Sequence, residues 1–119
     1  MTEAETAWLA GLIEGEGSFE ARADSRWPNA KINVSVRIKM SDEDVVRKAA
    51  DIMGIDQARV TCKPDTRSGR FSDMFEVRAF SADAVRVMRA VHPHMGARRG
   101  ARIDECLAAR PDLTREENA

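Results

Sequence analysis

Cysteine and histidine are scarce in this chain of 119 residues, and tyrosine is absent. Cys62 and Cys106 lie far apart and lack Cys-x-x-Cys spacing, which argues against a disulfide framework and against a cysteine-based zinc site. His92 and His94 flank Pro93, and we interpret them as polar loop residues rather than metal ligands. The scarcity of cysteine favours a reducing, intracellular location.

Long apolar runs are also missing. No segment approaches the ~20 residues that cross a bilayer, and the acidic start with Glu3 and Glu5 is unlike a secretory signal, so no membrane partner is expected. Hydrophobic residues make up 43% of the chain, which is too many for a disordered protein. The length predicts a single domain, 1–119, with a polar tail at about 111–119.

An excess of either charge is the third feature that the sequence lacks. It has 19 Lys+Arg against 20 Asp+Glu, a net charge of −1 and a pI of about 6.1. If these charges were evenly distributed, they would argue against a nucleic-acid-binding protein. Whether the chain can bind nucleic acid therefore depends on where the charges lie. Fifteen of the cations are Arg, which suits bidentate contacts to phosphates and bases, although a GC-rich gene produces the same bias.

Apolar spacing predicts a first helix at 6–15. One face of it is apolar and carries Trp8, Leu9, Leu12 and Ile13. The opposite side carries small residues four positions apart, Ala7, Gly11 and Gly15. Glycine inside a helix costs about 1 kcal/mol relative to alanine, so Gly11 is expected to permit close approach of another backbone.

Strands and helices alternate along the rest of the chain. The pattern predicts strands at 18–23, 31–40, 58–63 and 71–80, helices at 42–53 and 82–91, and a last helix ending at about 109. Ser41 and Ser81 are expected to cap the second and third helices, and segments 36–46 and 77–87 echo each other. This αββαββα order with a C-terminal helix predicts an α+β fold, in which a four-stranded antiparallel sheet carries helices on one face.

The outward faces of the strands collect much of the positive charge. Their basic residues are Arg22, Lys31, Arg37, Lys39, Arg59, Lys63 and Arg78. Against Glu20 and Glu76 these leave the face at a predicted +5. An ordinary solvated sheet face also carries cations, but Asn33, Ser35 and Thr61 add donors and acceptors suited to base edges.

Residues 9–17 read Leu-Ala-Gly-Leu-Ile-Glu-Gly-Glu-Gly and closely resemble the signature of the LAGLIDADG homing endonucleases. The first five residues match letter for letter, both acidic positions stay acidic, and the closing glycine is present. The family core has the αββαββα order, so the resemblance extends over about residues 5–110. It implies a saddle-shaped sheet that lies along the DNA major groove.

The resemblance implies a catalytic and metal-binding role for Glu16, the acid at the end of the motif helix, with Gly15 as a further metal ligand. The implied cofactor is Mg²⁺, or another divalent cation such as Mn²⁺, held over the scissile phosphates, and no organic cofactor is implied. Oxygen ligands suit Mg²⁺, and metal-activated water requires no protein nucleophile. Arg98 falls where the family places a basic residue beside the centre, and Arg99 is the alternative.

A single motif implies a homodimer, which supplies the second Glu16 by symmetry and makes double-strand breaks in a long, near-palindromic target. The implied dimer interface consists of Ala7, Gly11, Glu14 and Gly15. The implied contacts to double-stranded DNA are Glu20, Arg22, Arg26, Lys31, Asn33, Ser35, Arg37, Lys39, Arg59, Thr61, Lys63, Arg70, Glu76 and Arg78. Such cleavage serves intron or intein mobility in the family, and we expect a cytoplasmic protein of bacterial or phage origin.

Glu14 and Glu16 stand where the family usually has aspartate. The longer side chain moves the carboxylate by about one methylene group, which alters the metal geometry at Glu16, and Glu14 is expected to order the helix end rather than to catalyse. One alternative is therefore a catalytically silent LAGLIDADG-type protein that binds DNA or RNA as a regulator or intron-splicing factor. Another is a dimerising scaffold without a nucleic-acid partner.

Overall fold

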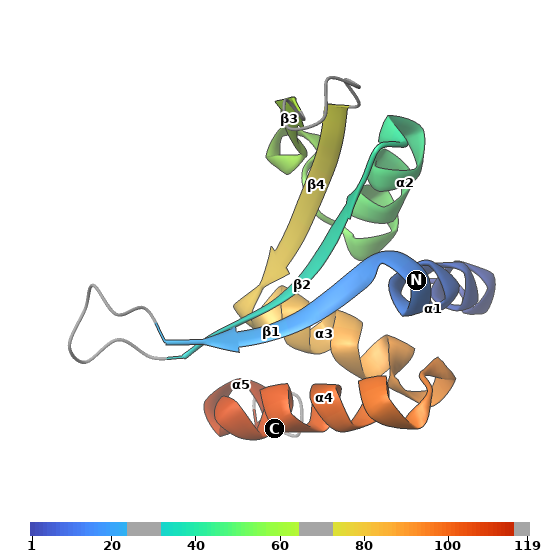
Figure 1. Cartoon of the computed structure of the whole chain (residues 1–119). Helices are drawn as coiled ribbons and strands as arrows, with labels where there is room; N and C mark the ends of the chain where they lie inside the picture. Colours follow the sequence, from blue (N-terminus) through green and yellow to red (C-terminus); the bar gives the residue numbers. More distant parts are fainter. Residues whose placement is uncertain (24–31, 65–72, 116–119) are drawn as a thin grey trace.

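The computed structural model describes residues 1–23, 32–64 and 73–115. In chain order, with η for a short 3₁₀ helix, its elements are α1 (Glu3–Glu16), β1 (Gly17–Arg22), β2 (Asn33–Met40), α2 (Glu43–Met53), η1 (Gln57–Arg59), β3 (Thr61–Pro64), β4 (Asp73–Phe80), α3 (Ser81–Val91), η2 (His92–His94), α4 (Ala97–Ala109) and α5 (Pro111–Arg115). The predicted αββαββα order and α+β class are confirmed (Figure 1). Within the described ranges, no helix is both long and apolar enough to span a bilayer.

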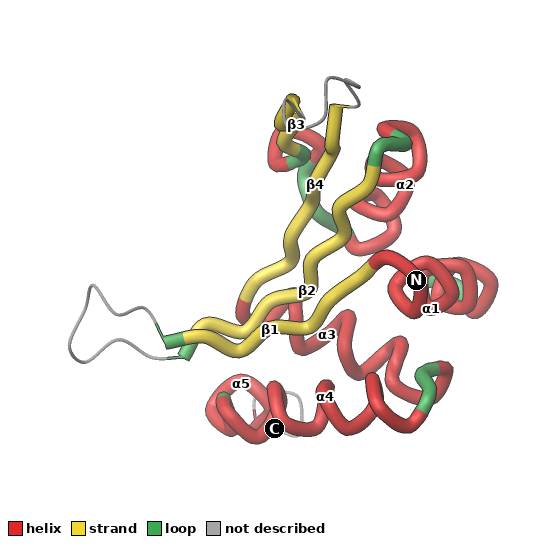
Figure 2. Tube along the Cα trace, in the orientation of Figure 1, coloured by secondary structure: helices red, strands yellow, loops and turns green. Residues whose placement is uncertain are grey.

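The strands form one antiparallel sheet in the order β1-β2-β4-β3, with β1 and β3 at its edges (Figure 2). Strand β1 pairs with β2 from Gly17 opposite Ile38 to Arg22 opposite Asn33. The central strands β2 and β4 pair so that Arg37 lies opposite Arg78. Each central strand runs closely into a helix, so the echo between segments 36–46 and 77–87 corresponds to two strand–helix units that lie side by side.

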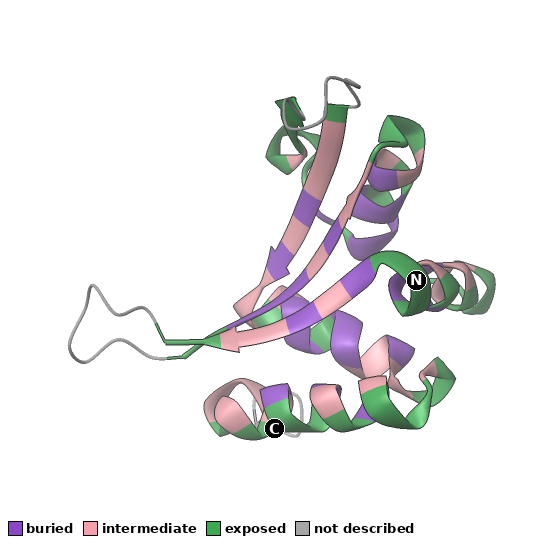
Figure 3. Cartoon of the chain, in the orientation of Figure 1, coloured by how far each residue is buried: buried purple, intermediate pink, exposed green. Residues whose placement is uncertain are grey.

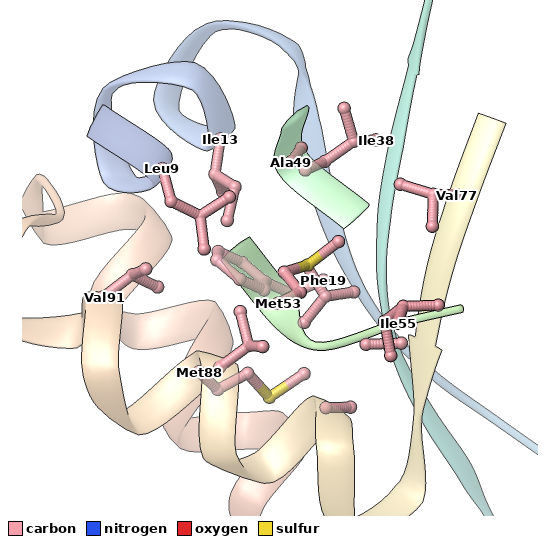
Figure 4. Packing of buried hydrophobic residues seen from close by; sticks show 14 of the residues in the cluster. Leu9, Ile13, Phe19, Ile38, Ala49, Met53, Ile55, Val77, Met88 and Val91 are labelled. Carbon is pink, nitrogen blue, oxygen red and sulfur yellow. The ribbon is translucent and has the colours of Figure 1, made fainter. Parts of the chain in front are cut away.

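The core lies between one face of the sheet and the helices. Helices α2 and α3 pack on β2 and β4, and α4 lies along β1. Leu9 and Ile13 of α1 are fully buried and reach the same cluster as Met53 of α2 and Met88 of α3 (Figure 4). Along β2 the apolar Val34, Val36 and Ile38 are fully buried, as the predicted period of two requires, but the polar Ser35 between them is buried as well (Figure 3). One face of the sheet is therefore left for solvent or a ligand.

Helix α1 begins earlier than its apolar spacing predicts. The Thr2 hydroxyl accepts a hydrogen bond from the Glu5 amide at 3.1 Å, and the Glu5 carboxylate accepts one from the Thr2 amide at 2.8 Å. This capping box satisfies amides that have no partner within the helix, and it precedes the first apolar positions. The hydrogen bonds from Thr2 also lower the pKa of the Glu5 carboxyl below its ordinary value.

The two predicted serine caps are wrong. Strand β2 ends at Met40, and Ser41 lies in the bend that follows it. The N-cap of α2 is therefore Asp42, whose side chain makes no capping hydrogen bond. Helix α3 follows Phe80 directly, and Ser81 is its first residue, with a left-handed φ of 52° that turns the chain out of β4. The predicted end of α2 is confirmed, since Gly54 adopts a φ of 72°.

Two further predictions need correction. Residues 58–60 do not extend the third strand, because Asp56 Oδ1 accepts a hydrogen bond from the Ala58 amide at 2.8 Å and starts η1 instead. The predicted polar tail is helical over Pro111–Arg115, where Leu113 packs against the core. Residues 116–119 of that tail lie outside the described residues.

Candidate active site and nucleic-acid interface

The end of α1 places a carboxylate at the surface where the helix turns into the sheet. Glu16 is the last helical residue and is exposed, and the chain enters β1 at Gly17, which is buried (Figure 3). A Cβ at Gly17 would lie 2.8 Å from Ile13 Cγ2 and 2.9 Å from Ile13 Cα. The closing glycine of the motif therefore lets β1 start directly over Ile13, and this turn sets the position of Glu16.

Two arginines of α4 bind the free edge of β1 beside this turn. Arg99 Nη1 donates to the Gly17 carbonyl at 2.7 Å, and Arg102 Nε donates to the Phe19 carbonyl at 3.1 Å. Both carbonyls belong to an edge strand, whose outer backbone groups lack a neighbouring strand. The side chains thus replace strand pairing and hold α4 against the start of β1. Sequence reasoning missed this role, although the spacing of three residues already puts both arginines on one helix face.

Helix α4 and β1 enclose a basic pocket next to Glu16. The pocket has a volume of ≈ 390 Å³ and is lined by Gly17, Ser18, Phe19, Arg98, Arg99, Arg102 and Glu105. Arg102 is paired with Glu105 at 2.9 Å, and Arg99 is held by Gly17, whereas Arg98 is exposed. Both arginines left open by the sequence line the pocket, and Arg98 is the more exposed of the two.

Glu16 and Gly15 offer oxygen ligands at the C-terminal end of a helix. The last carbonyls of a helix lack intrahelical partners, and that end carries partial negative charge. Carboxylate and carbonyl oxygens are the ligands that Mg²⁺ prefers, so this donor set fits a hard divalent cation. Across residues 1–23, 32–64 and 73–115, however, no three His, Cys, Asp or Glu side chains come together in a group that could hold a metal. In the described part of one chain, Glu16 therefore has no such group of acidic or imidazole ligands around it.

The stripe of small residues on α1 lies open to solvent. Ala7, Gly11 and Gly15 are all exposed, and among the described residues a Cβ added at either glycine would have no atom within 4 Å beyond its chain neighbours and its own helix backbone. Nothing in the chain's own described packing therefore requires glycine at these two positions, in contrast to Gly17. The exposed stripe and the exposed Glu16 lie on the same helix.

Glu14, the fourth residue predicted at the dimer interface, is exposed and lies close to α4. Its Oε1 would be 3.3 Å from a Cβ at Gly96, the N-cap of α4. A carboxylate there lies at the N-terminus of α4, which is the positive end of the helix dipole. The first turn of α4 has no acidic residue of its own. Within one chain, Glu14 thus supports the helix end that carries Arg98.

The outward face of the sheet brings together most of the predicted DNA contacts. Cross-strand register places the following residues on it: Glu20, Arg22, Asn33, Ser35, Arg37, Lys39, Thr61, Lys63, Glu76 and Arg78. Five cations and two carboxylates give the described part of this face a formal charge of +3. The near-neutral net charge of the chain therefore hides a basic surface.

Two of the predicted contacts differ from expectation. Arg59 belongs to η1 and not to a strand, so it does not extend the sheet face. Ser35 lies on the face but is only 3% exposed, because it sits in a central strand between Glu20 and Phe80 in register; the expectation that it offers donors to a base edge is wrong. Arg26, Lys31 and Arg70 lie outside the described residues.

The cysteines lie on β3 and α4, and the histidines lie on η2. Cys62 and Cys106 are both free thiols. Burial raises the pKa of the Cys106 thiol, which lies in the core. His92 Nε2 lies 3.0 Å from Asp104 Oδ1 and connects η2 to α4, although a 3₁₀ helix replaces the expected loop.

The fold defined by these elements is that of the LAGLIDADG homing endonucleases. One similar solved structure is the group I intron-encoded homing endonuclease I-CeuI complexed with DNA, with a TM-score of 0.59 and 14% identity over 98% of this chain. Another is the LAGLIDADG homing endonuclease I-GzeII in complex with its DNA target, with a TM-score of 0.53 and 10% identity over 75% of this chain. The resemblance drawn from residues 9–17 is confirmed at the level of the fold.

The matches cover only part of those proteins. The chain spans 57% of the length of I-CeuI and 28% of the length of I-GzeII. No family model and no curated protein sequence matches the chain. The similarity is therefore one of architecture, and activity must be argued from this chain's own residues.

Proposed function

We propose that this chain is one half of a homodimeric, divalent-metal-dependent DNA endonuclease that makes double-strand breaks in a long, near-palindromic target. One observation carries the proposal: the exposed Glu16 lies on the same helix as Gly11 and Gly15, where an added Cβ would contact nothing in the described packing of the chain. The motif at residues 9–17 and the fold shared with two DNA-bound homing endonucleases support it. Cleavage of this kind would serve the mobility of an intron or intein.

A two-fold dimer explains the glycines. Glycine in a helix interior costs about 1 kcal/mol of stability relative to alanine. At Gly11 and Gly15, no contact in the described packing of one chain requires the side chain to be absent. Two α1 helices packed through Ala7, Gly11 and Gly15 would use the missing side chains for close backbone contact. A two-fold axis through this contact places one Glu16 from each copy near the other. Each copy would then add its Glu16 to one shared ligand set.

In each half of such a centre, different residues would bind the metal, neutralise phosphate charge and hold α4 in place. Glu16 and the Gly15 carbonyl would hold the cation, which would supply Lewis-acid stabilisation of phosphate charge. Arg98 in the adjacent pocket would neutralise the charge that develops on the phosphate. Arg99 and Arg102 hold α4 on β1 and so keep Arg98 at a fixed distance from the end of α1.

The basic sheet face is the proposed DNA-binding surface. It follows β1 and β2 away from Glu16, so a duplex bound along it would pass the end of α1. Lys63 and Lys39 supply charge for phosphates, while Asn33, Arg37 and Arg78 supply directional donors for base edges. Two copies of this face, related by two-fold symmetry, would read two related half-sites.

Cleavage of a randomised duplex library in Mg²⁺ and in Mn²⁺ tests the proposal. The wild-type chain should cut both strands of a selected target. Glu16→Gln should bind the same target and not cut it, because the amide removes the anionic ligand. Glu3→Gln, an equal change at the exposed start of α1, is the matched control and should cut normally. Wild-type protein that enriches targets but never cuts them in either metal would favour the catalytically silent DNA- or RNA-binding alternative.

A further inference from the structure

Arg37 on β2 and Arg78 on β4 lie directly opposite each other on the outward sheet face. Directly opposite side chains have Cβ atoms about 5 Å apart, and like charges in such a pair destabilise a sheet. The two residues also occupy the same position in the echoing segments 36–46 and 77–87. The repeat therefore produces a pair of facing guanidinium groups at the middle of the sheet.

Two carboxylates offset this repulsion. Glu76 lies 2.7 Å from Arg37 Nε and 3.4 Å from Arg78 Nε. Glu20, across the sheet on β1, lies 3.8 Å from Arg37 Nη1 and 3.6 Å from Arg78 Nη1. Each carboxylate thus contacts both guanidinium groups. Glu20 also lies 3.7 Å from Arg22 Nε, so the network spans three strands and includes a third arginine.

The network is shielded from solvent more than a typical surface ion pair. The Glu20 and Glu76 side chains are only 15% and 22% exposed, and those of Arg37 and Arg78 are 30% and 32% exposed. The Nε atoms lie close to Glu76 and the Nη1 atoms close to Glu20, and both arginine side chains stay partly exposed. The exposed part of each arginine side chain is therefore open to a ligand.

We propose that Glu20 and Glu76 are positioning residues that hold Arg37 and Arg78 as a preassembled pair for reading guanine edges in the DNA major groove. Arginine donors match the O6 and N7 acceptors of guanine. A phosphate brought to the same guanidinium groups would also meet two carboxylates, and this like-charge repulsion disfavours backbone contacts there. The inference rests on the proposed function, because it assumes that the sheet face binds duplex DNA.

Base preference, position by position, is the measurement that tests this role. Duplexes enriched from a randomised library by the wild-type chain give the preferred target, and single-base variants of it give the discrimination at each position. The variants are Glu20→Gln, Arg37→Gln and Arg78→Gln. Glu43→Gln is the matched control, since it removes an equal charge from the Glu43–Arg47 pair on α2, away from the sheet face.

We expect Glu20→Gln to lower discrimination by about 5- to 100-fold at guanine positions that Arg37→Gln or Arg78→Gln also affects. Its affinity for unrelated duplex should rise or stay the same, since a negative charge is gone. Glu43→Gln should keep the wild-type profile. If Glu20→Gln does not fold, as thermal unfolding would show, Glu76→Gln tests the same expectation.

Two results would overturn the positioning role. One is an unchanged base profile for the folded Glu20→Gln or Glu76→Gln variant. The other is a loss confined to positions that Arg37→Gln and Arg78→Gln leave intact, because Glu20 would then act through Arg22 or contact a base itself. Failure of the underlying function is a separate result: the wild-type chain would enrich no duplex sequence at all, and the inference would fall with it.

Discussion

Arg99 donates a hydrogen bond from Nη1 to the carbonyl oxygen of Gly17 at 2.7 Å, and this contact joins α4 to the residue that follows Glu16. Residues 82 positions apart in the chain are thereby placed at the same corner of the molecule. The neighbouring Arg98 lines the pocket without such a contact to β1. Arg99 thus has a structural contact, and Arg98 is the one that we propose to be directed at a ligand.

Alanine substitutions separate these roles. Arg99→Ala should lower the free energy of unfolding by about 1 kcal/mol, because the Gly17 carbonyl loses a charged donor. Arg98→Ala should change it by less than about 0.5 kcal/mol, as expected for an exposed side chain, yet slow cleavage about 100-fold. Urea unfolding and single-turnover cleavage measure the two effects. A folded Arg99→Ala variant that loses cleavage while Arg98→Ala keeps it would exchange the assignments.

The motif glycines should respond to alanine in opposite directions. Gly17→Ala forces a Cβ to within 2.9 Å of the Ile13 backbone and should destabilise the fold by about 1–3 kcal/mol. Gly11→Ala meets no atom of its own chain and should stabilise the monomer by about 1 kcal/mol through helix propensity. Urea unfolding at a protein concentration low enough to keep the chain monomeric measures both.

Self-association supplies the second half of that prediction. Gly11→Ala should weaken the dimer, because a methyl group at the small-residue stripe separates the two backbones. Sedimentation velocity of the wild-type and Gly11→Ala chains compares their dissociation constants. Equal association of both chains would remove the stripe from the interface, whatever the effect on stability.

Acid should remove the contribution of the α1 capping box. Hydrogen bonds from Thr2 lower the folded-state pKa of Glu5, so the carboxylate stabilises the fold above its ordinary pKa and loses this effect as the pH falls through the lowered value. Urea unfolding should therefore find wild type more stable than Glu5→Ala at about pH 7 and should find the difference reduced at about pH 3. A difference that is the same at both pH values would assign the effect to packing.

Phosphate contacts and base contacts should differ in their salt dependence. Lys63 is exposed on β3 opposite Met74, with no acidic residue as its cross-strand neighbour. Lys63→Gln should weaken binding to all duplexes alike and reduce the slope of log affinity against log salt by about 1. Titrations at several salt concentrations measure it. A change in sequence preference, with the slope intact, would instead place Lys63 at a base edge.

Much of the architecture could be predicted because it follows from local pattern. The alternation along 31–40 predicts a half-buried strand, and Val34, Val36 and Ile38 are indeed fully buried. The helix at 42–53 and its end at Gly54 follow equally from periodicity and a left-handed glycine. The element order was sufficient to predict an antiparallel sheet with helices on one face.

The remaining features depend on contacts between distant residues. Strand register places Arg37 opposite Arg78 and buries Ser35. This register cannot be predicted from a local sequence pattern. The Arg99–Gly17 hydrogen bond depends on how α4 packs against the edge of β1. A single side chain also changes the local structure ahead of β3. Asp56 accepts a hydrogen bond from the Ala58 amide and starts η1, where the sequence pattern predicted a strand.

The mass of the complex on DNA tests the central claim, which is that one chain contains half of a two-fold site. Sedimentation equilibrium of the chain on a selected target duplex should give two copies per duplex, with one Glu16 contributed by each. A complex that contains a single copy at saturating protein concentration would contradict the account, because Gly11, Gly15 and Glu16 would then face solvent with no partner to complete the site.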